Sequence, residues 1–301
     1  MTDGLAWADA SAGDEGLLDE IFCLTFVRDL DEAEALRRMG GLPDTVAVRT
    51  VPDIGALHTF EDGYPTVASV LRLGAWTVVF EPGGFEGAGL VAGLSRGGEA
   101  VSVLRHDYAS HAFCYAVAGE EVSRFDPTFP AIRYGSDPDR LLPTMRSAGF
   151  TLAPDGNFDT PVTDCLRLAE LLTGTRPALG DLTGPLTSAH IEPWFSDAAT
   201  GGEPVAAADV RRLAGELGVA EASGLADALT AAEAASQIAI TPDSPLGLQV
   251  RDWLAGSRRA SWSANDHRAR DRMTDDERKR AFALGRLAYS IGDALRTATV
   301  R

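Results

Sequence analysis

The fold is indicated most clearly by one stretch of the sequence, Val67-Ala-Ser-Val-Leu-Arg-Leu73-Gly74-Ala75-Trp76-Thr-Val-Val-Phe-Glu81. It holds two runs rich in β-branched and aromatic residues, separated by Gly74 and Ala75. A two-residue spacer with a glycine to supply positive φ is typical of a tight β-hairpin. Because successive residues of a strand alternate between faces, Trp76, Val78 and Phe80 share one face, and we expect Trp76 to be buried.

Similar runs on either side of this hairpin extend the sheet. A second hairpin is predicted from residues 112–118 and 121–125, which flank Gly119-Glu120, and a strand at 100–104 precedes it. An earlier strand is expected at Phe22–Val27. These runs predict a mainly antiparallel sheet of about five to seven strands. Phe113, Tyr115 and Val117 would share one of its faces.

Helices follow where the apolar period changes from two to three or four. We expect a helix that begins near Asp31 and ends at Gly40-Gly41, one between Pro138 and Gly149, and one that begins at Thr160-Pro161. Those helices would cover the sheet. The fold class predicted for the first part of the chain is therefore α+β.

The last third of the sequence is typical of helices alone. Candidate helices cover about 205–217, 220–237, 244–255 and 274–298, and Thr274 with Glu277 forms a capping box at the start of the last one. Small and polar residues ending in proline, at 199–204, are typical of a linker. We therefore predict an α+β domain at 1–198, a linker at 199–204 and an all-α C-terminal module at 205–301.

Composition and charge limit the classes of partner. The 301 residues carry 44 acidic and 27 basic side chains, a formal net charge of -17 that repels nucleic acid and anionic membranes. Residues 251–301 hold twelve basic and seven acidic side chains, so they alone carry +5. Their arginines would form a solvated helix face or dock on acidic surface, in this chain or in a partner.

Targeting signals and cysteine usage point to the cytoplasm. The N-terminus is acidic where a secretion signal is basic, and no apolar run approaches the roughly 20 residues of a membrane span. The three cysteines are far apart and form no CxxC pair, which argues against a disulfide framework and a structural zinc site. We expect a cytoplasmic protein with no membrane association, no metal and no cofactor.

A nucleophile, a base and an acid occur within ten residues at 105–114, where His106, Asp107 and His111 precede Cys114. On a strand, His111 and Cys114 point to opposite faces, so a catalytic thiol is the weaker interpretation and a buried packing cysteine the stronger one. Zinc or manganese between the two histidines remains an alternative, although no recognised ligand spacing supports it.

Two glycine-rich segments are candidates for catalytic or anion-binding loops. Residues 81–89 (EPGGFEGAG) run from a strand into a helix, where backbone amides can receive an anion, but no lysine follows and Glu81 and Glu86 would repel phosphate. Ser95 lies in LSRGG, which is typical of a helix C-terminus and not of a nucleophile elbow. A tight strand-to-helix connection is the stronger interpretation.

Several of these elements, in the same order, resemble the actinobacterial family known as domain of unknown function 6461. They are TFVRDL and LRRMG near the N-terminus, WTVVFEPGG at 76–84, LSRGG at 94–98 and FDP at 125–127. The resemblance covers about residues 5–190, and Gly84 stands where the family pattern has asparagine. It supports the fold and implies no activity, substrate or cofactor.

Two hypotheses of function follow. The first is a non-catalytic binding or regulatory protein that interacts with another protein or a small ligand, with self-association through the C-terminal helices as a further option. The second is a small cytoplasmic hydrolase or transferase with a carboxylate and histidine site at the strand ends, and its catalytic residues stay unassigned. The candidate binding residues are Trp76, Glu81, Arg96, His106, Asp107 and Asp126.

Overall fold

The computed structural model describes residues 4–9, 20–152, 156–198, 205–236, 238–265 and 272–299. The chain divides into two compact units. The first comprises Met1–Gly55 with Thr66–Ala199, and the second comprises Ala56–Pro65 with Thr200–Arg301. The linker expected at 199–204 lies outside the described residues. The assignment of the short segment 56–65 to the second unit has no counterpart in the sequence prediction.

The first unit is built on one sheet, which has nine strands in the described part of the chain. Their order is β2-β9-β3-β4-β1-β5-β6-β7-β8, and every neighbouring pair is antiparallel. The strands are β1 (Ile21–Arg28), β2 (Ala47–Arg49), β3 (Thr66–Leu73), β4 (Trp76–Pro82), β5 (Glu99–His106), β6 (Ala112–Val117), β7 (Glu120–Phe125), β8 (Arg133–Tyr134) and β9 (Leu186–Ile191). The predicted α+β class is confirmed.

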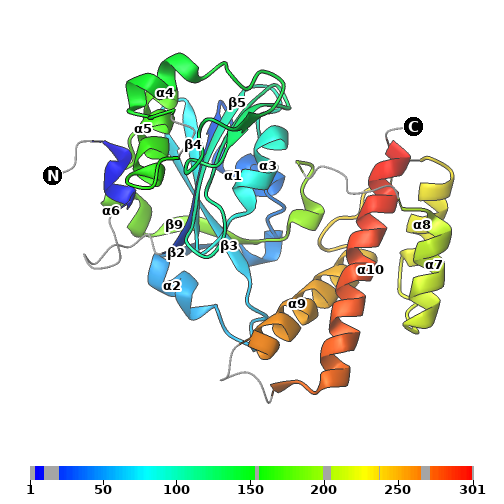
Figure 1. Cartoon of the computed structure of the whole chain (residues 1–301). Helices are drawn as coiled ribbons and strands as arrows, with labels where there is room; N and C mark the ends of the chain where they lie inside the picture. Colours follow the sequence, from blue (N-terminus) through cyan, green and yellow to red (C-terminus); the bar gives the residue numbers. More distant parts are fainter. Residues whose placement is uncertain are drawn as a thin grey trace. The chain divides into compact units, whose positions relative to one another are not determined.

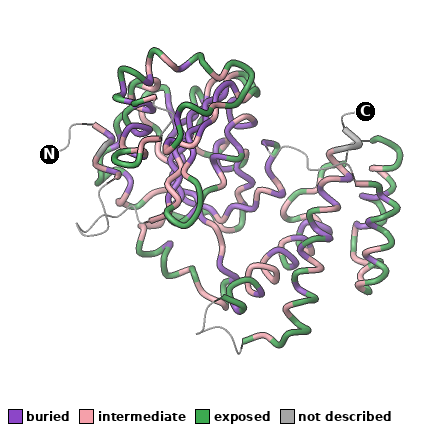
Figure 2. Tube along the Cα trace, in the orientation of Figure 1, coloured by how far each residue is buried: buried purple, intermediate pink, exposed green. Residues whose placement is uncertain are grey.

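Helices cover both faces of this sheet (Figure 1). One face packs against η1 (Leu5–Asp9), α4 (Leu142–Ala148), α5 (Pro161–Thr173) and α6 (Leu179–Thr183). The other packs against α1 (Glu32–Arg38) and α3 (Glu86–Leu94). The short elements η2 (Pro43–Thr45), α2 (Val51–Ala56) and η3 (Pro193–Phe195) complete the order. The central strands are therefore buried on both sides (Figure 2).

The two faces have different chemistry. The α5 face carries the large side chains, including Phe22, Phe80 and Phe113, which are almost fully buried. Trp76 lies on this face with 6% of its surface exposed, as expected from its alternation with Val78 and Phe80. The α3 face carries smaller residues, many of them alanine, valine and cysteine. Small side chains let α3 approach the sheet closely, which matters for the site described below.

Turn positions were predicted with mixed success. Gly74 has φ of +62° between Leu73 and Trp76, so the first hairpin is confirmed. The second turn is displaced by one residue from the prediction: it consists of Ala118 and Gly119, with φ of +52° and +92°. Glu120 already pairs with Val117 as the first residue of β7. Alanine takes the left-handed conformation here because the register of the two strands requires it.

The second unit contains four helices in its described residues. These are α7 (Ala207–Glu216), α8 (Leu225–Glu233), α9 (Pro245–Asn265) and α10 (Asp275–Thr299). The capping box of α10 is confirmed, because the Glu277 carboxylate accepts from the Thr274 amide at 2.7 Å and the Glu277 amide donates to the Thr274 hydroxyl at 3.3 Å. Leu287 and Ile291 of its apolar stripe are fully buried.

Segment 56–65 packs within this second unit against α9. Arg259 donates to the Phe60 carbonyl at 2.8 Å, and Arg258 donates to the Gly63 carbonyl at 3.2 Å. The ring of Trp262 lies between 4.7 and 5.0 Å from the rings of His58 and Tyr64. Arg272 also pairs with Glu61 at 2.6 Å, so one arginine of the basic C-terminal stretch binds an acidic residue of the same chain.

Candidate functional site

The register of the sheet separates the six candidate residues into two groups. Glu81 near the end of β4, His106 at the end of β5 and Asp107 and Asp126 just after β5 and β7 lie at one end of the sheet. Trp76, the first residue of β4, lies at the opposite end of the sheet. Arg96 lies at that same end, in the connection between α3 and the start of β5. Glu81 is level with Leu104 across β1, so His106 lies two strands away and two residues further along, which separates the two backbones by about 12 Å.

Glu81 is fully buried on the α3 face and holds the first turn of α3. Its Oε2 accepts from the Glu86 amide at 2.9 Å, and its Oε1 accepts from the Gly87 amide at 2.8 Å. Burial raises the pKa of this carboxyl to about 7, although both amide hydrogen bonds favour the ionised form. The partners of the Glu81 carboxylate are therefore the backbone amides at the start of α3.

A polar cluster lies beside Glu81 beneath α3. The Thr25 and Ser102 hydroxyls are 2.9 Å apart, and the Cys23 thiol lies 3.2 Å from Ser102. A Cβ on Gly87 would come within 2.3 Å of the Thr25 hydroxyl, so only glycine lets the helix approach this closely. The cluster is internally satisfied and covered by the helix.

The cysteines are unsuited to nucleophilic chemistry as they stand. Cys23, Cys114 and Cys165 are free and buried. Burial raises the pKa of Cys114 to about 12 and the pKa of Cys23 further still, with the charge of Glu81 adding to the second shift. Because the thiolate is the reactive form, these thiols are held in their inert state.

His106 ends β5, and Asp107 begins the turn between β5 and β6. The His106 amide donates to Nδ1 of His111 at 3.1 Å, which closes the turn. Asp107 accepts from Arg105 at 2.8 and 2.9 Å, and the hydrogen bonds from Arg105 lower the pKa of its carboxyl. Nδ1 of His106 is covered and makes no hydrogen bond within the described part of the chain.

Two exposed aromatic residues beside His106 were missed by the sequence analysis. Phe85, the residue before α3, is 49% exposed, and its ring lies 6.0 Å from that of His106. Tyr108 in the turn is 73% exposed and donates a hydrogen bond to Glu20. Their signal in the sequence is weak, because each is a single aromatic in a loop and breaks no pattern.

These loops form one continuous region. The Gly83 amide donates to the Ile21 carbonyl at 2.9 Å, and the Asp107 amide donates to the Glu20 carbonyl at 3.0 Å. We call residues 20–21, 83–86 and 105–111 the strand-end surface. It contains His106 and Asp107 of the sequence candidates and covers the end of the sheet next to Glu81.

The other three candidates lie apart from this surface. Asp126, two strands beyond β5, accepts from the Thr128 amide at 2.8 Å and so shapes the turn after β7. Trp76 is buried, with the Arg28 guanidinium 6.0 Å from its ring. Arg96 contributes its carbonyl to a polar network and makes no ion pair among the described residues.

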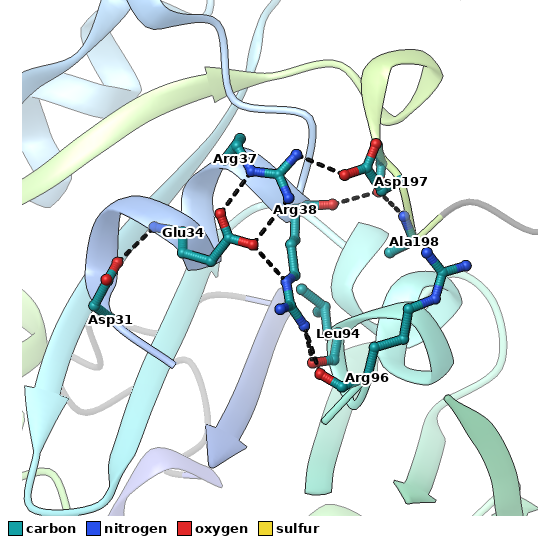
Figure 3. Close-up of polar contacts among 9 residues, drawn as sticks. Asp31, Glu34, Arg37, Arg38, Leu94, Arg96, Asp197 and Ala198 are labelled. Atoms are coloured by element: carbon teal, nitrogen blue, oxygen red, sulfur yellow. Dashed lines mark hydrogen bonds and ion pairs between the residues drawn. The ribbon is translucent and has the colours of Figure 1, made fainter. Parts of the chain in front are cut away.

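That network connects α1, the end of α3 and the chain after β9 (Figure 3). Arg38 donates to the Leu94 carbonyl at 3.3 Å and the Arg96 carbonyl at 2.8 Å, and pairs with Glu34 at 2.8 Å. Arg37 bridges Glu34 and Asp197, and its hydrogen bonds are the main reason that the pKa of Glu34 falls to about 2. The LRRMG and LSRGG stretches thus meet in space.

A model of the family of unknown function DUF6461 matches residues 2–180. The chain belongs to this family. The DUF6461 match spans the strand-end surface, Glu81 and the network between Arg38 and LSRGG, and it ends before β9 and the four helices of the second unit. Searches of curated proteins and of solved structures found no match to this chain.

The described residues contain neither a cluster of metal-ligating side chains nor a helix suited to span a membrane. No group of three or more histidine, cysteine, aspartate or glutamate side chains is placed to hold a metal ion there. In the same part of the chain, no helix combines the length and the apolar character of a membrane span.

Proposed function

We propose that this DUF6461 protein is a non-catalytic binding protein that recognises another protein through its strand-end surface. The observation that carries the proposal is the exposure of Phe85 and Tyr108 on two loops that meet beside His106. Large aromatic side chains held in the open on a rigid sheet end are typical anchors of protein interfaces. The strands that carry them are among the most buried elements of the molecule.

The polar groups nearby favour binding over catalysis. The Glu81 carboxylate is occupied by two backbone amides, and the Asp107 carboxylate is occupied by Arg105. A general base needs an oxygen or nitrogen within reach of a substrate proton, and these two carboxylates are already committed. The groups of this surface that a partner could contact are its aromatic rings, its imidazoles and its charged side chains.

Capture of partners from cells that naturally express the protein tests this proposal. The tagged full chain, its Phe85→Ala variant and its Phe158→Ala variant are cross-linked in the cells, and the captured proteins are identified by mass spectrometry. Phe158 is a matched control because it is 70% exposed and lies in the loop before α5. The proposal requires a partner that the wild type and Phe158→Ala capture and Phe85→Ala loses. Equal capture by all three contradicts it.

A small hydrolase or transferase is the second candidate function. It is favoured by one observation: Nδ1 of His106 has no hydrogen-bond partner in the described structure, so the ring is not committed to a structural role through that atom. Hydrolysis of generic ester and phosphate substrates, compared between wild type and His106→Asn, tests it. Activity that His106→Asn abolishes would favour the enzyme.

The proposal keeps two further expectations from the sequence. One is a cytoplasmic location, which fractionation of native cells tests. The other is self-association through the C-terminal helices, which light scattering of the full chain at several concentrations tests. Exposed Phe282 on α10 is a contact residue that such an association would use.

A further inference from the structure

We infer that the partner segment recognised by the strand-end surface is basic and rich in arginine. This inference rests on the proposed function and deepens it by naming the chemistry of the partner. It follows from three properties of the surface: its charge, the occupied N-terminus of α3, and the exposed aromatic rings.

The surface carries an excess of negative charge. The residues of the surface include three acidic ones, Glu20, Glu86 and Asp107, and one arginine, Arg105, so its formal net charge is -2 with its histidines neutral. Arg105 is only 13% exposed and is already bound to Asp107 and, at 3.5 Å, to Asp9. The whole chain carries a net charge of -17, which attracts cations over longer distances.

The N-terminus of α3 does not offer an opposing site for an anion. A helix N-terminus attracts negative groups through its unbonded amides. Here the Glu86 and Gly87 amides already donate to the Glu81 carboxylate, at 2.9 and 2.8 Å. The buried carboxylate therefore replaces an external anion, and the surface above it stays attractive to positive charge.

The aromatic rings select arginine among cations. Phe85 is 49% exposed and Tyr108 is 73% exposed. In the sequence, Phe85 precedes His106 and Tyr108 follows it. A guanidinium is planar and weakly hydrated, so it stacks on such rings while its N–H groups reach carboxylates at the rim. Lysine, with its strongly hydrated ammonium, gains less from the same arrangement.

Calorimetric titration of the full chain with three synthetic peptides of equal length tests the inference: oligo-arginine, oligo-lysine and oligo-glutamate. Oligo-arginine is expected to bind most tightly, oligo-lysine more weakly and oligo-glutamate not at all. Raising the salt from about 0.05 M to about 0.3 M should weaken oligo-arginine binding, because the Debye length shortens. Absence of oligo-arginine binding overturns the inference.

Paired variants distinguish a defined surface from general attraction to an acidic protein. Glu86→Gln removes one charge from the strand-end surface, and Glu120→Gln removes one from the opposite end of the sheet, where Glu120 is exposed. Phe85→Ala is expected to weaken oligo-arginine binding about three-fold. Glu86→Gln should weaken it by more than Glu120→Gln does, and Phe158→Ala should leave it unchanged. Equal effects of the two glutamine variants overturn the inference.

The result is separable from the test of the proposed function. If Phe85→Ala loses a native partner but oligo-arginine does not bind, the binding function stands and the basic partner is wrong. If oligo-arginine binds as expected but Phe85→Ala captures every native partner, the surface prefers arginine and the proposed function is wrong.

Discussion

The Glu81 carboxylate and the Gly87 amide, on different elements, are joined by a fully buried hydrogen bond of 2.8 Å. The second carboxylate oxygen accepts from Glu86, so one side chain at the end of β4 fixes the first turn of α3. A glutamine offers one acceptor where the site uses two. We expect Glu81→Gln to lower the free energy of unfolding by about 1–3 kcal/mol, and Glu81→Ala by more. Urea denaturation at pH 5 measures both, and a Glu81→Gln variant as stable as wild type at that pH would contradict the assignment.

The raised pKa of Glu81 predicts a pH dependence of stability. The unfolded carboxyl has a pKa near 4.5 and the folded one about 7. Between these values the folded state binds the extra proton, so this stabilising contribution is complete below about pH 4.5 and is lost as the pH rises through 7. It amounts to on the order of 3 kcal/mol. The difference in unfolding free energy between wild type and Glu81→Gln should therefore shrink from pH 5 to pH 7.5; a constant difference would contradict the shift.

Glycines 87 and 89 of α3 are expected to respond to alanine in opposite directions. A Cβ at Gly87 would lie 2.3 Å from the Thr25 hydroxyl, whereas a Cβ at Gly89 would meet nothing within 4 Å. Gly87→Ala should destabilise the fold by about 1–3 kcal/mol. Gly89→Ala should stabilise it by about 0.5–1 kcal/mol, because alanine favours the helix. Thermal unfolding of the two variants provides the comparison, and destabilisation by both would argue against this packing of α3.

Arg38 and Arg37 share Glu34 as a partner but differ in burial. Arg38 is 20% exposed and also donates to two carbonyls, whereas Arg37 is 55% exposed and bridges carboxylates alone. Arg38→Ala should lower the free energy of unfolding by about 1–3 kcal/mol, since the Leu94 and Arg96 carbonyls lose their donor. Arg37→Ala should change it by less than about 1 kcal/mol. Urea denaturation of the pair decides, and equal effects would show that the carbonyl contacts contribute little.

Arg259 is expected to protect segment 56–65 from proteolysis. It donates to the Phe60 and Glu61 carbonyls at 2.8 and 3.0 Å. Arg259→Ala should speed chymotrypsin cleavage after Phe60, because the local opening that precedes cleavage becomes easier. Arg280→Ala, on an exposed position of α10, serves as the control. Unchanged cleavage in Arg259→Ala would show that the guanidinium does not hold the segment.

The elements predicted correctly from the sequence are those in which several local signals indicate the same structure. The first hairpin has alternating large side chains and a glycine turn, and α10 has a capping box followed by an apolar stripe; both are confirmed. Strand β9 was not predicted because its sequence, Leu-Thr-Ser-Ala-His-Ile, mixes small polar residues with apolar ones and shows no regular alternation. Its residues are buried because neighbouring strands pair with it on both sides. The helix expected from Pro138 begins at Leu142, since the Asp137 amide is bonded to Val122 of β7. Tertiary contacts override local signals at both places.

The candidate site divides in the same way. His106 and Asp107 were candidates because their residue types suggest chemistry, and a functional role for them stays a prediction; the hydrogen bond from the His106 amide to His111 closes the turn that holds them. Phe85 and Tyr108 were missed, since exposure depends on which loops meet at a sheet end. Trp76 was both a candidate binding residue and a residue expected to be buried, and its burial, which the strand alternation predicted, is confirmed.

Segment 56–65 depends on residues from outside the part of the chain that matches DUF6461. It lies within the stretch that matches DUF6461, yet the side chains that cover it, among them Trp262 and Arg259, come from α9, beyond the end of that match. A protein shortened after residue 198 would leave His58 and Tyr64 without these neighbours. A relative that lacks such helices must therefore cover the segment with other residues or replace its aromatic side chains. In this chain, joining the family region to a different C-terminal part would expose His58 and Tyr64.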